Sequence, residues 1–391
     1  MSPSARLRLF YALYYGSVGA TLPYLAPYLR GLGFSGAAIG AVQLIGPLLG
    51  APVALGWAAA ADRLGAPARA LAWASAWAAA AAAFLPLARV PAAVALVLGA
   101  QALAERAVIP LADSVTLELS RPPGPSYARI RLFGSLGYIA AAQGLGLLLT
   151  ARGERPGDLA VPLSIAACVA GYALAARRLP ETPSPGRRPS LGDLRALAGD
   201  VRLVALLLTC AAHWACCAPF HLLFGLFVRD AGLPAGVTGL GMAAGVGAEV
   251  LALFLYPRLS ARFGPRALFG AAFAASALRW ALLAQTRQAA PVVALQLLHG
   301  LTFGVFWGAA MSAMAALVPA RLRVTGQALF SAVVFGGGNA VGYQLAGMAY
   351  DRLGGVGPLY GWAAAGELAP LAAALLFAPR WRSREGVTRS L

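Results

Sequence analysis

The stretch from Pro110 to Tyr138 reads PLADSVTLELSRPPGPSYARIRLFGSLGY. It places Asp113 inside one apolar segment and Arg131 at the start of the next, with a short turn rich in proline, glycine and arginine between them. Ionised side chains close to a bilayer core are costly unless they pair or line a water-filled cavity, so they are candidates for function. The stretch therefore indicates a polytopic membrane protein whose few intramembrane charges form its working site.

The composition of the whole chain agrees with this interpretation. The chain has 391 residues, of which 60% are hydrophobic and 12% are charged, and its mean hydropathy is +0.71. A soluble domain is roughly 25% charged, so a soluble fold is excluded. The four cysteines all fall within apolar segments, which argues against a disulfide framework. The length predicts an all-α membrane protein with about twelve spanning helices of ~20 residues.

Apolar runs separated by short polar loops predict the positions of these spans. The expected spans are Leu7–Leu29, Ala37–Ala61, Ala66–Leu87, Pro91–Leu117, Ile130–Leu149, Leu159–Ala176, Leu203–Val228, Val237–Leu255, Ala267–Ala284, Val292–Leu317, Gly326–Tyr350 and Pro358–Phe377. The longest polar stretch runs from Arg177 to Arg202 and marks the best domain boundary. We therefore expect a six-helix bundle over 1–176, a cytoplasmic central loop over 177–202 and a second six-helix bundle over 203–391.

The distribution of arginine predicts the orientation of the chain. All 31 basic residues are arginine. If the N-terminus lies inside, the cytoplasmic segments carry 22 of them, the opposite loops carry 7 and two lie within spans. Because cytoplasmic loops are enriched in basic residues, this split places both termini in the cytoplasm. A basic charge arranged in this way reflects topology, and we expect no nucleic-acid partner.

The two halves of the chain resemble each other. The sequence Asp62-Arg63-Leu64-Gly65 ends the second predicted span, and Ala261-Arg262-Phe263-Gly264 follows the eighth, 199 residues later. RLFGSLGY opens the fifth span and QALFSAVVFGGG opens the eleventh. Two six-span repeats related by a pseudo-twofold axis are typical of secondary transporters, whose substrate sites lie near the midplane.

These segments resemble those of the major facilitator superfamily. Gly56 and the Asp62–Gly65 stretch look like the motif that this superfamily carries between its second and third helices. In the family, the aspartate caps and pairs across helix ends and so holds one conformation. The resemblance thus implies a conformational latch, for which the candidate residues are Gly56, Asp62, Arg63, Gly65, Arg262 and Gly264. The second copy has Ala261 in place of the aspartate.

Within the superfamily, the chain is similar to the branch that contains the 3-phenylpropionic acid transporter and, more distantly, lactose permease and nucleoside/proton symporters. The supporting segments are PLADS, ARIRLFGSLGY, the region of His213, GVGAEV, LRWAL and QLLHGLTF. They are spread over nearly the whole chain. Compared with lactose permease, Asp113 stands at the position of the substrate-binding glutamate. Arg131 stands at the position of its essential arginine, and Tyr138 at that of its sugar-stacking tryptophan.

The second half carries its own set of charged positions. Glu249, Arg279 and His299 stand at the places of the glutamate, arginine and histidine network of lactose permease. That family carries a proton-coupling glutamate one turn after the histidine, where this chain has Thr302. Because an arginine can hold a glutamate ionised and a histidine titrates near neutral pH, this set suits a proton-coupled switch. Glu249 is therefore the best candidate proton carrier, with Asp113 and His299 as further candidates.

Several other polar residues within spans are open to two interpretations. Glu105 and Arg106 are neighbours in sequence and face different ways on a helix, so they cannot simply pair. The residues His213, Cys216, Cys217 and His221 share one helical face and are of types that suit zinc, but one helix rarely completes a metal shell, so we expect packing and no bound metal. His213 and Asn339 are candidates for substrate binding. Glu367 lies in the last span, often a peripheral helix in this superfamily, and is expected to have no direct role.

These observations predict a secondary active transporter in a bacterial inner membrane. Its substrate would be a small polar or anionic organic solute of the aromatic acid, sugar or nucleoside class, moved by alternating access in symport with protons. A proton-antiport exporter of drugs or metabolites is the alternative, and a sensor or receptor that has lost transport is a third. An enzyme is not expected, since the only possible metal cluster is the doubtful one beside His213. We expect the protein to need no cofactor, to contact membrane lipids and to be a monomer.

Overall fold

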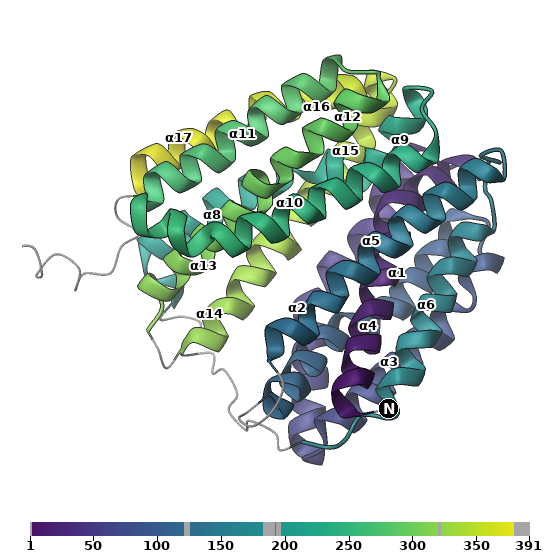
Figure 1. Ribbon diagram of the computed structural model, residues 1–391, viewed down its shortest axis with the longest axis vertical. Helices are drawn as coiled ribbons and strands as arrows, with labels where there is room; N and C mark the ends of the chain where they lie inside the picture. Colours follow the sequence, from purple (N-terminus) through teal and green to yellow (C-terminus); the bar gives the residue numbers. More distant parts are fainter. Residues whose placement is uncertain (1, 121–125, 183–191, 193–196, 320–321, 379–391) are drawn as a thin grey trace, which may run out of the picture. The chain divides into compact units, whose positions relative to one another are not determined.

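The computed structural model describes residues 2–120, 126–182, 192, 197–319 and 322–378 of the chain. Within these ranges the chain forms helices and no strand (Figure 1). Packing divides the chain into two compact units. Unit 1 contains Met1–Arg188, His221–Ala243 and Gln344–Arg352, and unit 2 contains Pro189–Phe220, Ala244–Tyr343 and Leu353–Leu391. Most of the predicted central loop, 183–191 and 193–196, lies outside the described residues, and the predicted domain boundaries stay a prediction.

Eight helices in the described part of the chain are long and apolar enough to cross a bilayer, or nine if one bent pair is counted as a span. They are Pro67–Leu87, Pro91–Leu119, Tyr127–Ala151, Val201–Asp230, Ala235–Arg262, Pro265–Gln285, Ala289–Leu317 and Val356–Phe377. The bent pair is Gly36–Gly50 with Pro52–Ala61. The expected all-α membrane protein is therefore confirmed. The segments expected to be the first, sixth and eleventh spans are helical but do not pass this test, the sixth because Ala160–Ala176 is too short.

Unit 1 is built around six helices from the first half of the chain. These are α1 (Pro3–Gly31), α2 (Gly36–Leu64), α3 (Pro67–Ala82), α4 (Pro91–Leu119), α5 (Tyr127–Ala151) and α6 (Ala160–Ala176). Helix α1 packs against α5 and α6, while α4 packs against α2 and α3. The 3₁₀ turn η1 (Leu85–Leu87) follows α3. Small residues allow these close approaches: a Cβ atom at Gly137 of α5 would lie 2.0 Å from the carbonyl oxygen of Ala12.

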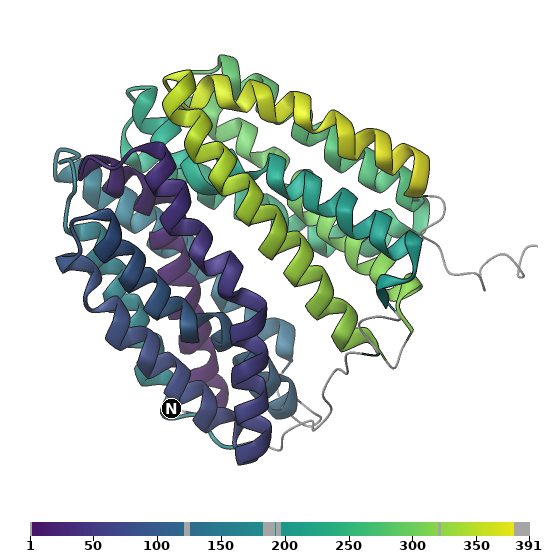
Figure 2. The ribbon, with the colours of Figure 1, turned by 180° about the vertical axis from the view of Figure 1, so that it is seen from behind.

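Unit 2 contains the helices of the second half apart from the segments assigned to unit 1. The chain continues through α8 (Val201–Cys216), α9 (Ala218–Asp230), α10 (Ala235–Arg262), α11 (Pro265–Gln285), α12 (Ala289–Leu295), the 3₁₀ turn η2 (Gln296–Leu298), the π-helix η3 (Gly300–Val305), α13 (Phe306–Leu317), α14 (Arg323–Phe330), the π-helix η5 (Ser331–Gly338), α15 (Asn339–Leu353), α16 (Val356–Gly366) and α17 (Leu368–Phe377). Helix α11 packs against α16, α17 and η3. Within each unit the helices run side by side for much of their length (Figures 1 and 2).

The helix surfaces are apolar on the outside. Trp73, Leu96 and Phe254 are exposed by 65%, 74% and 69%. Buried positions, by contrast, include serine, glutamine, histidine, arginine and glutamate side chains. This distribution reverses the soluble pattern and fits helices whose outer faces contact lipid and whose polar groups are kept inside the protein.

One contact in unit 1 joins the start of α2 to the end of α15. The backbone N–H groups of Gly36 and Ala37 donate to the two carboxylate oxygens of Asp351, at 2.7 and 2.9 Å. The helices touch through glycine: a Cβ atom at Gly347 would lie 2.3 Å from the carbonyl oxygen of Gly36. A carboxylate at a helix N-terminus satisfies free N–H groups and complements the helix dipole. Asp351 therefore caps α2 from another helix.

A loop outside the spans offers a test of stability against pH. The Arg152 guanidinium donates to Asp158 at 2.8 Å and, with the backbone N–H of Ala160, holds the pKa of that carboxyl below its usual 3.8. A lowered pKa in the folded state stabilises the protein above the unfolded-state pKa, and this stabilisation is lost as the pH falls through the folded-state pKa. We expect Asp158→Asn to lower the free energy of unfolding by about 1 kcal/mol at pH 7, since Arg152 is half exposed.

Thermal unfolding of the purified protein in detergent checks this expectation. The difference in Tm between wild type and Asp158→Asn should shrink as the pH is lowered through the carboxyl's titration. Arg89→Gln removes an exposed charge from another loop, away from the causes of the Asp158 shift, and it serves as the control. A Tm difference that stays constant from pH 7 to pH 3 would show that the carboxylate charge makes no contribution.

Candidate functional site

Unit 1 brings Asp113 of α4 and Arg131 of α5 together. The Nε atom of Arg131 lies 3.6 Å from Oδ1 of Asp113, and the two side chains are 30% and 27% exposed. The Tyr11 hydroxyl donates to the same Oδ1 atom at 2.6 Å and lies 3.0 Å from Oγ1 of Thr116. The predicted contact between the two charges is thus present, and each side chain keeps part of its surface accessible. Its role in substrate binding stays a prediction.

The rings of two tyrosines on α1 contact the guanidinium of Arg131. Arg131 donates to the Tyr15 hydroxyl, and its guanidinium carbon lies 4.4 Å from the centroid of the Tyr15 ring and 5.1 Å from that of Tyr11. Cations over aromatic faces are attracted by the ring quadrupole. Tyr11 and Tyr15 of α1 thereby fix the orientation of Arg131, leaving a planar donor group that can bind a carboxylate or hydroxyl groups.

Other candidates of unit 1 lie apart from this pair. Tyr138 is buried on α5, and a Cβ atom at Gly19 would lie 2.5 Å from its backbone oxygen, so α1 and α5 are in close contact there. Glu105 of α4 accepts from Gln101 of the same helix at 2.9 Å. Arg106 is directed against α2, where its guanidinium occupies the space beside Gly46. Glu105 and Arg106 therefore face different ways, as expected.

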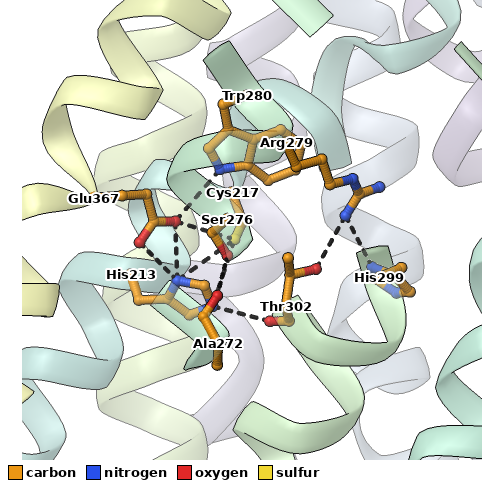
Figure 3. A network of polar contacts seen from close by, with 9 residues as sticks. All are labelled: His213, Cys217, Ala272, Ser276, Arg279, Trp280, His299, Thr302 and Glu367. Carbon is orange, nitrogen blue, oxygen red and sulfur yellow. Dashed lines mark hydrogen bonds and ion pairs between the residues drawn. The ribbon is translucent and has the colours of Figure 1, made fainter. Parts of the chain in front are cut away.

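Unit 2 contains a second polar network, shown in Figure 3. Arg279 of α11 is fully buried, and its NH1 atom donates to Nδ1 of His299 at 3.2 Å and to Oγ1 of Thr302 at 3.1 Å. Arg279 also donates to Gln296. Because a guanidinium can only donate, Nδ1 of His299 is an acceptor and its proton is on Nε2. That Nε2 atom lies 3.6 Å from Oε2 of Glu249.

The predicted association of Glu249, Arg279 and His299 is therefore present, with His299 between the other two. Glu249 and His299 are 22% and 13% exposed, whereas Arg279 is enclosed. The guanidinium lies against two aromatic rings, 4.2 Å from the centroid of Phe220 and 4.6 Å from that of Trp280. The network thus extends from a partly accessible carboxylate to a fully buried cation.

Thr302, which stands where lactose permease has a proton-coupling glutamate, joins Arg279 to His213. Its backbone oxygen lies 3.2 Å from Nε2 of His213 on α8. On the other side of the imidazole, Nδ1 of His213 lies 2.9 Å from both carboxylate oxygens of Glu367. Both side chains of this pair are 0% exposed. Thr302 belongs to the π-helix η3, a deviation that occurs frequently at functional sites.

Glu367 is enclosed within unit 2, although the last span is often a peripheral helix in the superfamily, and the expectation that it has no direct role stays a prediction. Glu367 lies between α16 and α17, with its side chain inside unit 2. It also accepts from the Trp280 indole N–H at 3.4 Å, and the Cys217 thiol lies 3.9 Å away. An ionisable group in so enclosed a place is costly without partners, and the side chains of His213, Trp280 and Cys217 provide them.

The expected helical face of His213, Cys216, Cys217 and His221 is interrupted, because α8 ends at Cys216 and α9 begins at Ala218. His213, Cys217 and Glu367 have ligand-type atoms within 4.8 Å of one another. In a tetrahedral zinc site with bonds of about 2.0 Å, ligand atoms stand about 3.3 Å apart. The 2.9 Å contacts from His213 to Glu367 are hydrogen-bond lengths. The present arrangement therefore fits a hydrogen-bonded pair better than a metal site.

The remaining candidates are only partly defined. Oδ1 of Asn339, at the start of α15, is buried with no hydrogen-bond partner among the described residues. Of the latch candidates, Gly65 ends α2 with a φ of +58°, Arg262 ends α10 and Gly264 caps α11. Gly56 and Arg63 lie on α2. The side chain of Asp62 lies outside the described residues, so the latch stays a prediction.

Sequence reasoning missed Tyr11 and Tyr15 as partners of Arg131, and Glu367 as the partner of His213. The tyrosines belong to a group of five in the first span and nothing in the sequence separates these two from the others. Glu367 is 154 residues from His213. Its signal was that it is an ionisable residue inside an apolar segment, which by itself marks a functional candidate.

Comparison with known proteins agrees with this architecture. The model of the MFS_1 like family matches residues 4–358. The maltose permease of Geobacillus stearothermophilus is 29% identical over 342 residues, which cover 85% of this chain and 83% of the permease. A protein of Escherichia coli (strain K12) named "Probable 3-phenylpropionic acid transporter" is 27% identical over 368 residues, covering 89% of this chain and 91% of that protein.

Solved structures share the fold. The crystal structure of the nucleoside transporter NupG matches with a TM-score of 0.84 at 17% identity, covering 96% of this chain and 99% of NupG. A bacterial homologue of the lysosomal transporter Spinster matches with a TM-score of 0.71 at 17% identity, covering 97% of this chain and 95% of that chain. With the family model matching nearly the whole sequence, the chain belongs to the MFS_1 like family, and it is a multi-pass membrane transporter of the major facilitator superfamily.

Proposed function

We propose that the protein is a secondary active transporter that moves a small polar or anionic organic solute in symport with protons. The observation that carries this proposal is the arginine–carboxylate pair of Asp113 and Arg131, part-exposed inside otherwise apolar helices. A guanidinium fixed by two tyrosine rings can bind a carboxylate or sugar hydroxyls in two-pronged fashion. The names of two relatives, a maltose permease and a probable 3-phenylpropionic acid transporter, support a sugar or an aromatic acid as the solute.

The proposal includes the finer architecture. The chain would cross a bacterial inner membrane twelve times as two six-helix bundles, with both termini in the cytoplasm, and would work as a monomer by alternating access. Tyr138, His213 and Asn339 would contribute to substrate binding with the charged pair, and Arg279 and His299 would do so from unit 2. The stretch from Asp62 to Gly65 would hold one conformation.

Proton coupling is supported by the contact between Glu249 and His299. Both groups are partly accessible, and a carboxyl and an imidazole are both groups that can take up and release a proton. Arg279 lies directly behind His299, so a change in the charge of the first pair would alter the hydrogen bonds of the buried guanidinium. This gives an accessible acid a physical connection to the interior of unit 2.

The test uses the purified full-length protein in liposomes that contain a pH-sensitive dye. Maltose, 3-phenylpropionate and uridine are added in turn outside, with the inside and outside pH equal at the start. We expect one of them to drive protons inward, and Glu249→Gln to lower this flux at least tenfold because the amide cannot carry a proton.

The exposed carboxylate of Glu181, which pairs with Arg69, provides the control variant Glu181→Gln, whose flux should match wild type. Proton movement opposite to the solute would replace symport by antiport. Solute uptake without any proton movement would exclude proton coupling, and flux in Glu249→Gln equal to wild type would exclude that carboxylate as the accessible carrier.

A further inference from the structure

The buried pair of His213 and Glu367 has a hydrogen-bond arrangement that defines where its protons are. A backbone carbonyl can only accept, so Nε2 of His213 carries the hydrogen that it donates to Thr302. The 2.9 Å contact between Nδ1 and Glu367 therefore needs a second, separate proton. This proton resides either on Glu367, which leaves a neutral pair, or on His213, which leaves an ion pair. In both cases the pair as a whole is uncharged.

Loss of that one proton changes the net charge of the pair. The imidazole would then be neutral and the glutamate ionised, which leaves one negative charge where both side chains are fully buried. An isolated buried carboxylate is expensive. Trp280 donates to Oε1 of Glu367 at 3.4 Å, and the Cys217 thiol lies 3.9 Å from the same oxygen. These two donors offset part of the free-energy cost of the negative charge. The deprotonated pair is therefore accessible, and the pair can either hold or release a proton.

The groups facing the pair come from each element packed around it. The titratable, charged and polar ones among the described residues are Cys216 and Cys217 at the end of α8, Trp280 and Arg279 of α11, Thr302 of η3, and Tyr360 of α16, which stacks on Trp280. Arg279 is the cation of this set. Its bond to Oγ1 of Thr302 and the bond from His213 to the backbone oxygen of Thr302 meet at one residue.

We propose that His213 and Glu367 form the site that holds the coupling proton inside unit 2, and that Thr302 links this site to Arg279. The inference rests on the proton-coupled transport proposed above. When the pair is loaded it is uncharged, and Arg279 remains bonded to Thr302 and His299. When the pair releases its proton, the new negative charge attracts the Arg279 guanidinium and weakens those two bonds. The accessible Glu249 and His299 then serve as the entry to an enclosed proton site.

The decisive variant is Glu367→Gln, which keeps the size and hydrogen-bonding capacity of the side chain but cannot take up or release the proton. We expect it to lose at least tenfold of the uptake driven by an imposed pH gradient. Exchange of labelled for unlabelled solute without a gradient should stay within threefold of wild type, because exchange needs no net proton release. The probe is whichever of maltose, 3-phenylpropionate and uridine the wild type exchanges fastest.

A second measurement needs no solute. Infrared difference spectra of the detergent-solubilised protein between high and low pH should show one carboxyl or imidazolium group gaining a proton in wild type, and this band should be missing in Glu367→Gln. If wild type transports none of the three solutes, the proposed function fails, and these spectra still decide whether the pair holds a proton.

Two variants of Thr302 test whether this residue links the His213–Glu367 pair to Arg279. Thr302→Val removes the acceptor of Arg279 but keeps the backbone carbonyl, and it should uncouple uptake from the gradient, whereas Thr302→Ser should restore coupling. Ser276→Ala is the matched control, since its buried hydroxyl donates to the backbone oxygen of Ala272 within α11 and its loss should leave coupling unchanged.

Three results would overturn the inference. Coupled uptake in Glu367→Gln at the wild-type rate would show that the carboxyl does not carry the proton. Loss of exchange together with uptake in a stably folded Glu367→Gln would indicate a structural or substrate-binding role. One equivalent of Zn²⁺ bound by wild type and lost in both Glu367→Gln and Cys217→Ser would make the cluster a metal site instead.

Discussion

Replacement of Arg131 by alanine is expected to lower solute uptake at least a hundred-fold. The side chain presents a rigid planar group, held by the Tyr15 hydroxyl and by the faces of two tyrosine rings. A hundred-fold loss corresponds to about 2.7 kcal/mol, which is the magnitude of a charge-assisted hydrogen-bond pair. Initial uptake of labelled solute into liposomes, with equal amounts of reconstituted protein, measures the change.

The lysine variant separates charge from geometry at the same position. Arg131→Lys keeps the positive charge but loses the two-pronged donor and the flat surface that stacks on Tyr11 and Tyr15, so we expect a loss of at least tenfold. Arg8→Lys is the matched control, because the Arg8 guanidinium also lies over an aromatic ring, 5.3 Å from the centroid of Phe133. Uptake by Arg131→Ala within threefold of wild type would remove Arg131 from the substrate site.

A bulky residue at Gly347 is expected to lower transport at least tenfold. A Cβ atom there would lie 2.3 Å from the carbonyl oxygen of Gly36, which belongs to the backbone and cannot rotate away. Gly347→Leu would therefore push the start of α2 away from α15 and from the carboxylate of Asp351. We expect this contact to form in one state of the alternating-access cycle proposed above, and the variant would prevent it.

Labelling can show whether the contact has opened. In a background where Ser35 is replaced by cysteine, Gly347→Leu should react with a polar maleimide several-fold faster than its Gly347 parent. The control is Gly361→Leu, at a glycine with open space where a Cβ atom would be. If Gly347→Leu and Gly361→Leu take up solute at equal rates, the contact between α2 and α15 has no part in transport.

The sequence predicted the elements of this fold better than their details. Long apolar runs predict spanning helices because the bilayer demands them, and intramembrane charges mark themselves by their cost. The pairing of Asp113 with Arg131 could be predicted because the two residues lie on consecutive helices around one short turn. Likewise, Glu249, Arg279 and His299 lie on three successive segments in the order that the family resemblance suggested.

The remaining parts of the site depend on packing that has no local signature. His213 and Glu367 meet only because α8 and the junction of α16 and α17 are brought together in unit 2, which hydropathy cannot predict. The π-helix at Thr302 lies where Gly300 and Gly304 pack closely against α10, and a Cβ atom at Gly300 would lie 2.8 Å from the oxygen of Ala248. The cap on α2 is provided by Asp351, more than 300 residues away in the sequence.

The indole of Trp280 gives this molecule an optical reporter of its own. Its N–H group points at Oε1 of Glu367, and its ring stacks on Tyr360 with a centroid distance of 5.6 Å and an interplanar angle of 9°. The emission wavelength of an indole responds to charge placed near its nitrogen. In a variant whose other tryptophans are replaced by phenylalanine, the fluorescence colour of Trp280 should therefore follow the ionisation of the buried glutamate in real time, without any added dye.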